Sequence, residues 1–188
     1  MVDKAEALIG TWVHKYPHFA WPKPRMDFHA EAIAWWNRWL RGEENGIEKT
    51  PQVRVYIQDA PKPSLRREFD PGFWAAKESW ETPDMATFYV EQYGTLAPGM
   101  PITGASGHDR YLKSPLDTGL MAGEWFTLKP DAEMALDQRL DDAGSLVIET
   151  APLAEAQDFL GQPVLELDVA TEADIGNLCA RLVDIHPD

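Results

Sequence analysis

Between Asp27 and Gly42 the sequence has the spacing of a helix. Tryptophans and other apolar residues recur there every three or four positions, and polar residues fill most of the remaining positions. Asp27 is a plausible N-cap, and Arg41 followed by Gly42 is typical of a helix end. The pattern predicts an amphipathic helix over residues 28–41. Its tryptophans more often form a packing face than a ligand cage.

The chain on either side of this helix has a different character. Three prolines between Thr11 and Met26 exclude a continuous helix there, and the short apolar run at residues 7–10 could be a buried strand. Residues 43–51 are polar, contain an Asn45-Gly46 turn and are typical of a linker.

Beyond Pro51 the sequence predicts short β-strands separated by loops rich in glycine and proline. Several of the predicted strands alternate apolar and polar residues, as half-buried antiparallel strands do. The predicted strands are residues 53–57, 87–90, 145–150, 164–169 and 178–185. This pattern predicts a mainly β region built as a β-sandwich or jelly roll.

Composition excludes several classes of function. The net charge of −14 disfavours binding to nucleic acid or to an anionic membrane surface. No apolar run is long enough to span a bilayer, and the N-terminus lacks the pattern of a signal peptide, so we expect a cytoplasmic protein. The single cysteine, Cys179, excludes an intrachain disulfide and is expected to be a buried structural thiol. The Asp141-Asp142 pair is expected to be solvated.

Few side chains suggest chemistry when taken alone. His14, His18 and His29 are spaced closely enough to suggest zinc, but Pro17 breaks a helical pair and no protease-type Glu follows. We therefore predict no metal site and no cofactor. The nearest approach to a nucleophile elbow is the loop around Ser106, in which the second glycine is one place early and no strong strand precedes. A glycine-rich loop is the better interpretation of that segment.

Several segments, in order along the chain, resemble the cocaine-esterase-like (CocE/NonD, Xaa-Pro dipeptidyl-peptidase-like) family of serine hydrolases. They are residues 8–14, 35–46, 51–57, 137–139 with 146–153, and 180–188. The run from Leu8 to His14 looks like the family's Gly-Pro-Trp-x-His segment, which follows the last strand of an α/β-hydrolase sheet. Thr11 stands where that family usually has proline.

The resemblance implies two parts. Residues 1–46 would be the C-terminal end of an α/β-hydrolase domain, and residues 47–188 a partial jelly-roll (galactose-binding-like) β-sandwich. His14 would be the general base of a Ser-His-Asp triad in an enzyme that hydrolyses esters or amides. Trp12 and Trp35 would help to line the substrate pocket, together with Trp21 and Trp36. The nucleophile, acid and oxyanion donors are expected upstream of Met1, so this chain alone is expected to be inactive.

Two other functions remain open. A β-sandwich of this kind could be a non-catalytic binding module for carbohydrate or peptide, with Trp74, Trp80 or Trp125 as stacking platforms, although these tryptophans are more often packing contacts. Alternatively, unpaired strand edges could make the chain a homo-oligomer with a purely structural role. In the intact enzyme the partner would instead be a small acyl ester, amide or peptide substrate.

Overall fold

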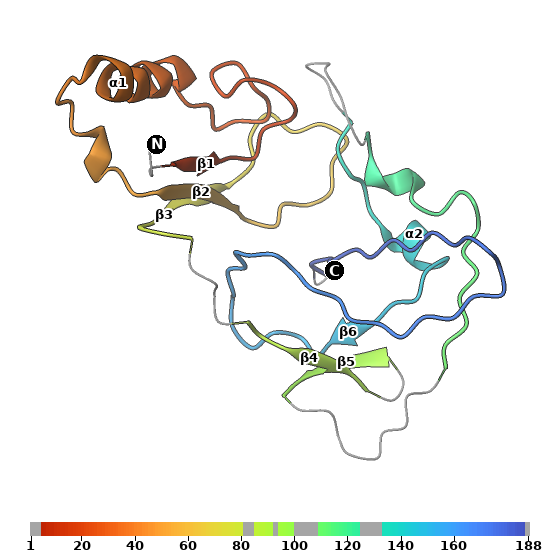
Figure 1. Ribbon diagram of the computed structural model, residues 1–188. Helices are drawn as coiled ribbons and strands as arrows, with labels where there is room; N and C mark the ends of the chain where they lie inside the picture. The colour runs from red at the N-terminus through yellow and green to blue at the C-terminus, as the bar shows by residue number, and fades with distance from the viewer. Residues whose placement is uncertain (1–4, 81–84, 92–93, 100–108, 125–132, 187–188) are drawn as a thin grey trace.

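The computed structural model describes residues 5–80, 85–91, 94–99, 109–124 and 133–186. Two small three-stranded sheets and one long helix dominate this part of the chain (Figure 1). The elements are β1 (Ala7–Ile9), α1 (Phe28–Arg41), η1 (Ile47–Lys49), β2 (Val53–Gln58), β3 (Gly72–Lys77), β4 (Phe88–Val90), β5 (Thr95–Pro98), η3 (Leu120–Ala122), α2 (Arg139–Asp142) and β6 (Glu149–Thr150). The chain is therefore rich in sheet with few helices, and no barrel closes among these residues.

Helix α1 confirms the predicted helix at both ends. The Asp27 carboxylate accepts a hydrogen bond from the Ala30 backbone N–H at 3.0 Å, which satisfies one of the free donors of the first turn. At the other end Gly42 adopts the left-handed conformation, φ 72°, and donates its N–H to the Arg38 carbonyl at 3.1 Å. Strong local signals at the two caps explain why the bounds could be predicted.

The first sheet has the order β1-β2-β3, with β2 in the centre. Strand β1 runs parallel to β2, with Ala7 opposite Val53, and β3 runs antiparallel to β2, with Gln58 opposite Gly72. The predicted strand at residues 53–57 is confirmed, and its Val53, at 2% exposure, is among the most buried side chains of the described residues. Residues from both sides of position 46 thus share one sheet, and α1 lies beside it (Figure 1).

The second sheet has the order β4-β5-β6 and lies at the other end of the molecule (Figure 1). Strand β4 confirms the predicted strand at residues 87–90 and pairs antiparallel with β5. Of the strand predicted at residues 145–150, only Glu149 and Thr150 are paired, in parallel with β5. A sheet this small buries little apolar surface, so most of its side chains remain accessible.

The prediction of strands at residues 164–169 and 178–185 is wrong. The structure assigns no strand to either segment, and the residues of both segments are exposed. Alternating apolar and polar residues give a strand two different faces, but a strand also needs a neighbouring strand for its backbone groups. Among the described residues no strand pairs with either segment. The prediction that Cys179 is a buried thiol is wrong for the same reason, because Cys179 lies exposed in this unpaired segment.

Asp141 also differs from expectation, because it is buried to 4% exposure rather than solvated. Its two carboxylate oxygens accept hydrogen bonds from the backbone N–H groups of Gly119, at 2.8 Å, and Met121, at 3.1 Å. Arg181 lies 3.8 Å from the Asp141 carboxylate and 2.9 Å from that of Asp142, and so attaches the C-terminal segment to α2. Burial is tolerated because the charge is hydrogen-bonded and paired.

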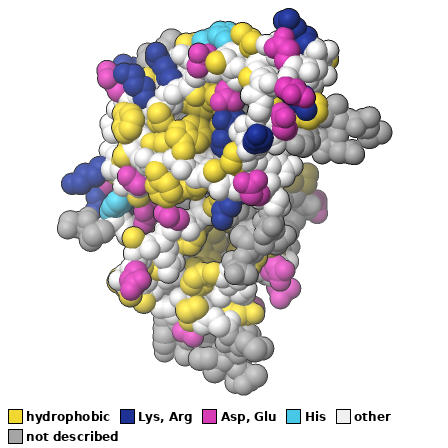
Figure 2. Space-filling model, turned by 90° about the vertical axis from the view of Figure 1, so that its left-hand side faces the viewer, with side chains coloured by type: hydrophobic (Ala, Val, Ile, Leu, Met, Phe, Trp, Pro, Cys, Tyr) yellow, Lys and Arg dark blue, Asp and Glu magenta, His cyan; other side chains and the backbone are white. Residues whose placement is uncertain are grey.

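The surface is mixed in character. Figure 2 shows hydrophobic side chains gathered on one face, with acidic and basic side chains around them. On α1 itself, Ile33, Trp36 and Leu40 are 59%, 54% and 74% exposed. None of the helices in the described part of the chain is long and apolar enough to cross a membrane.

Candidate functional site

His14 lies on an exposed turn in the connection between β1 and α1. Strand β1 ends at Ile9, the chain then forms an irregular loop, and α1 begins at Phe28. The loop is closed by a backbone hydrogen bond from Val13 N–H to the Trp21 carbonyl at 3.0 Å. His14 is therefore an exposed residue in the loop that follows β1, a strand that runs parallel to β2. The hydrogen bond between Val13 and Trp21 holds the two arms of this loop together.

Trp12 is held tightly within this loop. Its indole N–H donates to the Pro24 carbonyl at 2.6 Å, and its ring lies 6.1 Å from that of Trp74 on β3. The Trp74 ring in turn lies edge-on to the buried Tyr56, with centroids 5.3 Å apart. These contacts join the loop to the sheet through a row of three aromatic rings.

The structure does not place Trp35 in the same aromatic row. Trp35 is on α1 and packs on Trp39, with ring centroids 5.7 Å apart. Trp12 and Trp35, which the family resemblance implies as substrate-binding residues, thus belong to two different aromatic clusters. The loop around Ser106, and Trp125, lie outside the described residues.

A buried carboxylate lies beneath the loop. Asp70 is completely buried, and it accepts hydrogen bonds from the Thr11 hydroxyl, from Gln58 Nε2 at 2.8 Å and from Arg67 Nε at 2.7 Å. Its own carbonyl accepts a hydrogen bond from the Tyr56 hydroxyl at 2.9 Å. Burial raises the pKa of Tyr56, and the nearby negative charges, Asp70 among them, raise it further.

No local pattern marks Asp70 as a central residue. It precedes Pro71 and Gly72, which is a turn signal that usually places an aspartate at the surface. Its burial depends on donors that are 59, 12 and 3 positions away in sequence. Only the folded structure brings these groups together.

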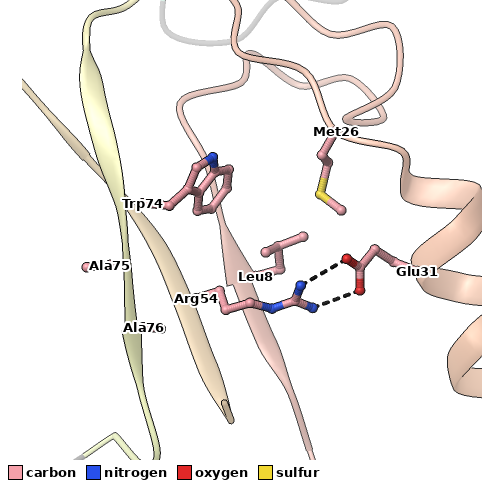
Figure 3. A pocket seen from close by; sticks show the side chains of 7 residues that line it. All are labelled: Leu8, Met26, Glu31, Arg54, Trp74, Ala75 and Ala76. Carbon is pink, nitrogen blue, oxygen red and sulfur yellow. Dashed lines mark hydrogen bonds and ion pairs between the residues drawn. The ribbon is translucent and has the colours of Figure 1, made fainter. Parts of the chain in front are cut away.

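A groove of 260 Å³ lies between α1 and the first sheet (Figure 3). Its wall is mainly apolar, and the charged groups in it are Glu31 and Arg54, which form a two-pronged ion pair at 2.9 and 2.8 Å. The hydrogen bond from Arg54, and then its positive charge, hold the pKa of Glu31 below the ordinary 4.5, against the opposing effect of burial. Arg54 also lies 3.7 Å from Glu6, so its charge is already neutralised by carboxylates of the chain.

The histidines near the loop do not assemble a metal centre with other ligands. His18 and His29 are close, with ring centroids 4.1 Å apart, and His18 also packs edge-on against Phe19. Within the described ranges, no group of three or more His, Cys, Asp or Glu side chains could hold a metal ion. These two histidines are part of an aromatic cluster around the start of α1.

Comparison with known proteins shows the family to which the chain belongs. Residues 45–188 match the family described as the X-Pro dipeptidyl-peptidase C-terminal non-catalytic domain. The chain belongs to this family. That assignment confirms the resemblance to cocaine-esterase-like hydrolases that the sequence motifs indicated.

One curated relative extends the match to the N-terminal segment. Cocaine esterase of Rhodococcus sp. (strain MB1 Bresler) is 25% identical over 210 residues, an alignment that covers 99% of this chain and 34% of the esterase. The chain thus spans about a third of the length of that relative. No solved structure matches.

Proposed function

We propose that this chain supplies the general-base histidine, His14, and a β-sandwich region to a serine hydrolase that cleaves ester or amide bonds. The observation that carries the proposal is the alignment with cocaine esterase, which extends through the loop of His14 as well as the region of the non-catalytic domain. The exposed position of His14 between a parallel strand and a helix supports it, since a base must reach a reacting group from the surface of a cleft.

The mechanism follows from the chemistry of acyl transfer. His14 would accept the proton of a serine hydroxyl as the oxygen attacks the carbonyl carbon, and would return that proton to the departing alcohol or amine. Water would then repeat the cycle on the acyl-enzyme and regenerate the serine. The serine, the acid that orients His14 and the oxyanion donors would come from residues outside this chain, so the chain alone should show no turnover.

The division of the chain is part of the same proposal. Residues 1–46 would belong to the hydrolase part and residues 47–188 to a jelly-roll domain. The family match that starts at residue 45 supports this boundary, and the pairing of β1 with β2 would then be a contact between the two parts. Trp12 and Trp35 would contribute apolar walls to the acyl pocket. An enzyme of this kind would act in the cytoplasm on a small acyl ester, amide or peptide.

A chimera tests the role of His14. The third of Rhodococcus cocaine esterase that aligns with this chain would be replaced by residues 1–188, and hydrolysis of a p-nitrophenyl ester would be measured. We expect the chimera to be active and His14→Ala to lower kcat by roughly 1,000-fold or more. His18→Ala, four residues further on, is the matched control and should retain activity within a few-fold. A folded chimera that keeps its activity after His14→Ala would refute the proposal.

A second experiment examines the chain alone. Incubation with a fluorophosphonate, followed by measurement of the intact mass, should give no mass shift. A stoichiometric shift that His14→Ala abolishes would show that a working nucleophile lies within these residues, with Ser106 the first to examine.

The alternative function is a non-catalytic module that binds carbohydrate or peptide. Trp80 is 48% exposed, and such a ring could stack on a sugar. Trp74 is less suitable, because it already packs on Trp12 and Tyr56. Saturable quenching of tryptophan fluorescence by galactose or an oligosaccharide, abolished in Trp80→Ala, would favour this module over the hydrolase.

A further inference from the structure

The Asp70 carboxylate connects three segments that are distant in sequence. Thr11 comes from the loop that carries His14, Gln58 from the end of β2, and Arg67 from the β2–β3 connection. Gln58 Nε2 also donates to the Thr11 hydroxyl oxygen at 2.7 Å. The Thr11 hydroxyl therefore donates to Asp70 and accepts from Gln58, and this fixes its orientation.

The same short segment also holds the far side of the loop. The Asp70 N–H donates to the Lys23 carbonyl at 2.8 Å, and the Lys23 N–H donates to the Glu68 carbonyl at 2.7 Å. Asp70 thus contacts the loop through its side chain at Thr11 and through its backbone at Lys23. His14 lies between these two attachment points in sequence, and the Val13–Trp21 hydrogen bond joins the two arms of the loop.

A buried carboxylate gives this attachment its strength. The Asp70 carboxylate is shielded from water, so its negative charge is stabilised only by its hydrogen-bond donors. Removing one donor costs free energy, because a buried carboxylate oxygen is left without a hydrogen bond. Hydrogen bonds to a charged group are also stronger than those between neutral groups. The loop cannot move away from the sheet at Thr11 without incurring that cost.

We propose that Asp70 is a positioning residue, which fixes the loop of His14 against the first sheet through Thr11 and Lys23. Its meaning for catalysis rests on the proposed function, whereas its effect on the loop does not. Thr11 is the point at which the attachment can be tested with the smallest change, because Asp70→Ala also removes the partner of Arg67 and can unfold the sheet.

The test compares Thr11→Val, which has the same shape without the hydroxyl, with Thr11→Ser, which keeps the hydroxyl. Hydrogen exchange would be followed by NMR at the Trp12 indole N–H and the Val13 backbone N–H, both of which are hydrogen-bonded within the loop. We expect Thr11→Val to accelerate exchange at both sites by roughly tenfold or more, and Thr11→Ser to restore the original rates.

Two controls separate a local effect from general destabilisation. The Glu91 N–H, bonded to the Thr95 carbonyl beside the second sheet, should keep its exchange rate in both Thr11 variants. Ser145→Ala, which removes a hydroxyl that donates to the Asp141 carbonyl at 2.7 Å, should leave exchange at Trp12 unchanged. Unchanged exchange at Trp12 and Val13 in Thr11→Val, or equal acceleration at Glu91, would overturn the proposal.

The chimera then measures the catalytic consequence. There Thr11→Val should lower kcat several-fold with little change in KM, and Thr11→Ser should restore it, because the loop positions a base rather than binding substrate. If His14→Ala leaves the chimera active, the proposed function fails, while hydrogen exchange in the chain alone still decides whether Asp70 holds the loop. Faster hydrogen exchange at Trp12 and Val13 in Thr11→Val, together with an unchanged kcat, would overturn the positioning role of Asp70.

Discussion

The Glu31–Arg54 ion pair joins α1 to the central strand of the first sheet (Figure 3). Glu31→Gln keeps the shape of the side chain and removes its charge. Two unit charges about 4 Å apart attract by about 1 kcal/mol in water and by about 4 kcal/mol near a protein surface. Because the Glu31 side chain is 36% exposed and that of Arg54 is 24% exposed, solvent screening and the cost of partial burial reduce the net gain. We expect Glu31→Gln to lower the free energy of unfolding by about 1 kcal/mol at pH 7.

The pH dependence follows from the direction of the pKa shift. The pKa of Glu31 is lower in the folded chain than the ordinary 4.5, so the unfolded state binds more protons in the interval between the two values. The stabilisation by Glu31 is therefore fully present above pH 4.5 and is lost as the pH falls through the folded value. The amide introduced by Glu31→Gln does not titrate, so the difference between the two proteins should shrink over that interval.

Urea denaturation followed by tryptophan fluorescence at pH 7 and at pH 3 measures this difference. Glu43→Gln is the matched control, because Glu43 pairs with Arg41 at 3.0 Å but the two side chains are 42% and 70% exposed. It should change stability much less. A difference for Glu31→Gln that is the same at both pH values, or no larger than that of the control, would show that the ion pair with Arg54 does not stabilise the fold.

Three further predictions concern other sites. A Cβ atom on Gly72, φ 150°, would lie 2.1 Å from the Ile57 carbonyl oxygen, so Gly72→Ala should lower the free energy of unfolding, measured by urea denaturation, by about 3 kcal/mol. Gly99→Ala is the control: Gly99 has φ 109° but open space around its Cβ position, so this variant should lose less stability. Asp141→Asn should cost about 1–2 kcal/mol and accelerate hydrogen exchange at the two backbone N–H groups that donate to its carboxylate; unchanged exchange would contradict this role. Cys179 should react with Ellman's reagent in the native protein nearly as fast as in urea, and strong native protection would show that the thiol is covered.

The elements that could be predicted from the sequence are those whose ends are determined by neighbouring residues in the chain. The ends of α1 are set by Asp27 and Gly42, residues adjacent to the helix, and both predicted bounds are confirmed. Strand β2 is confirmed as well, because its alternating apolar residues fit a buried central strand. The segment 164–169 has a similar pattern but forms no strand, since alternation does not specify which neighbour a strand will pair with.

Burial of charge was the other point at which the sequence failed. Asp70 and Asp141 are buried because each accepts hydrogen bonds from residues that are distant in sequence, Thr11 for Asp70 and both Gly119 and Met121 for Asp141. Nothing in the residues beside them distinguishes these aspartates from the many exposed acids of the chain. The role of His14, by contrast, could be proposed only from the resemblance, because a single histidine in a loop carries no signal of its own.

The parallel pairing of β1 with β2 also bears on the order of folding. Ala7 lies opposite Val53, so this contact closes a loop of about 45 residues, whereas β2 and β3 are joined by a connection of about a dozen. Closing the longer loop loses more chain entropy, and strands close in sequence should therefore associate first. We expect the β2–β3 hairpin to form early, and β1 to dock afterwards and bring the His14 loop onto Asp70. Pulsed hydrogen-exchange labelling would then show protection at Val55, whose N–H faces β3, before Ile9, whose N–H faces β2, and a partly folded chain would not yet hold His14 in place.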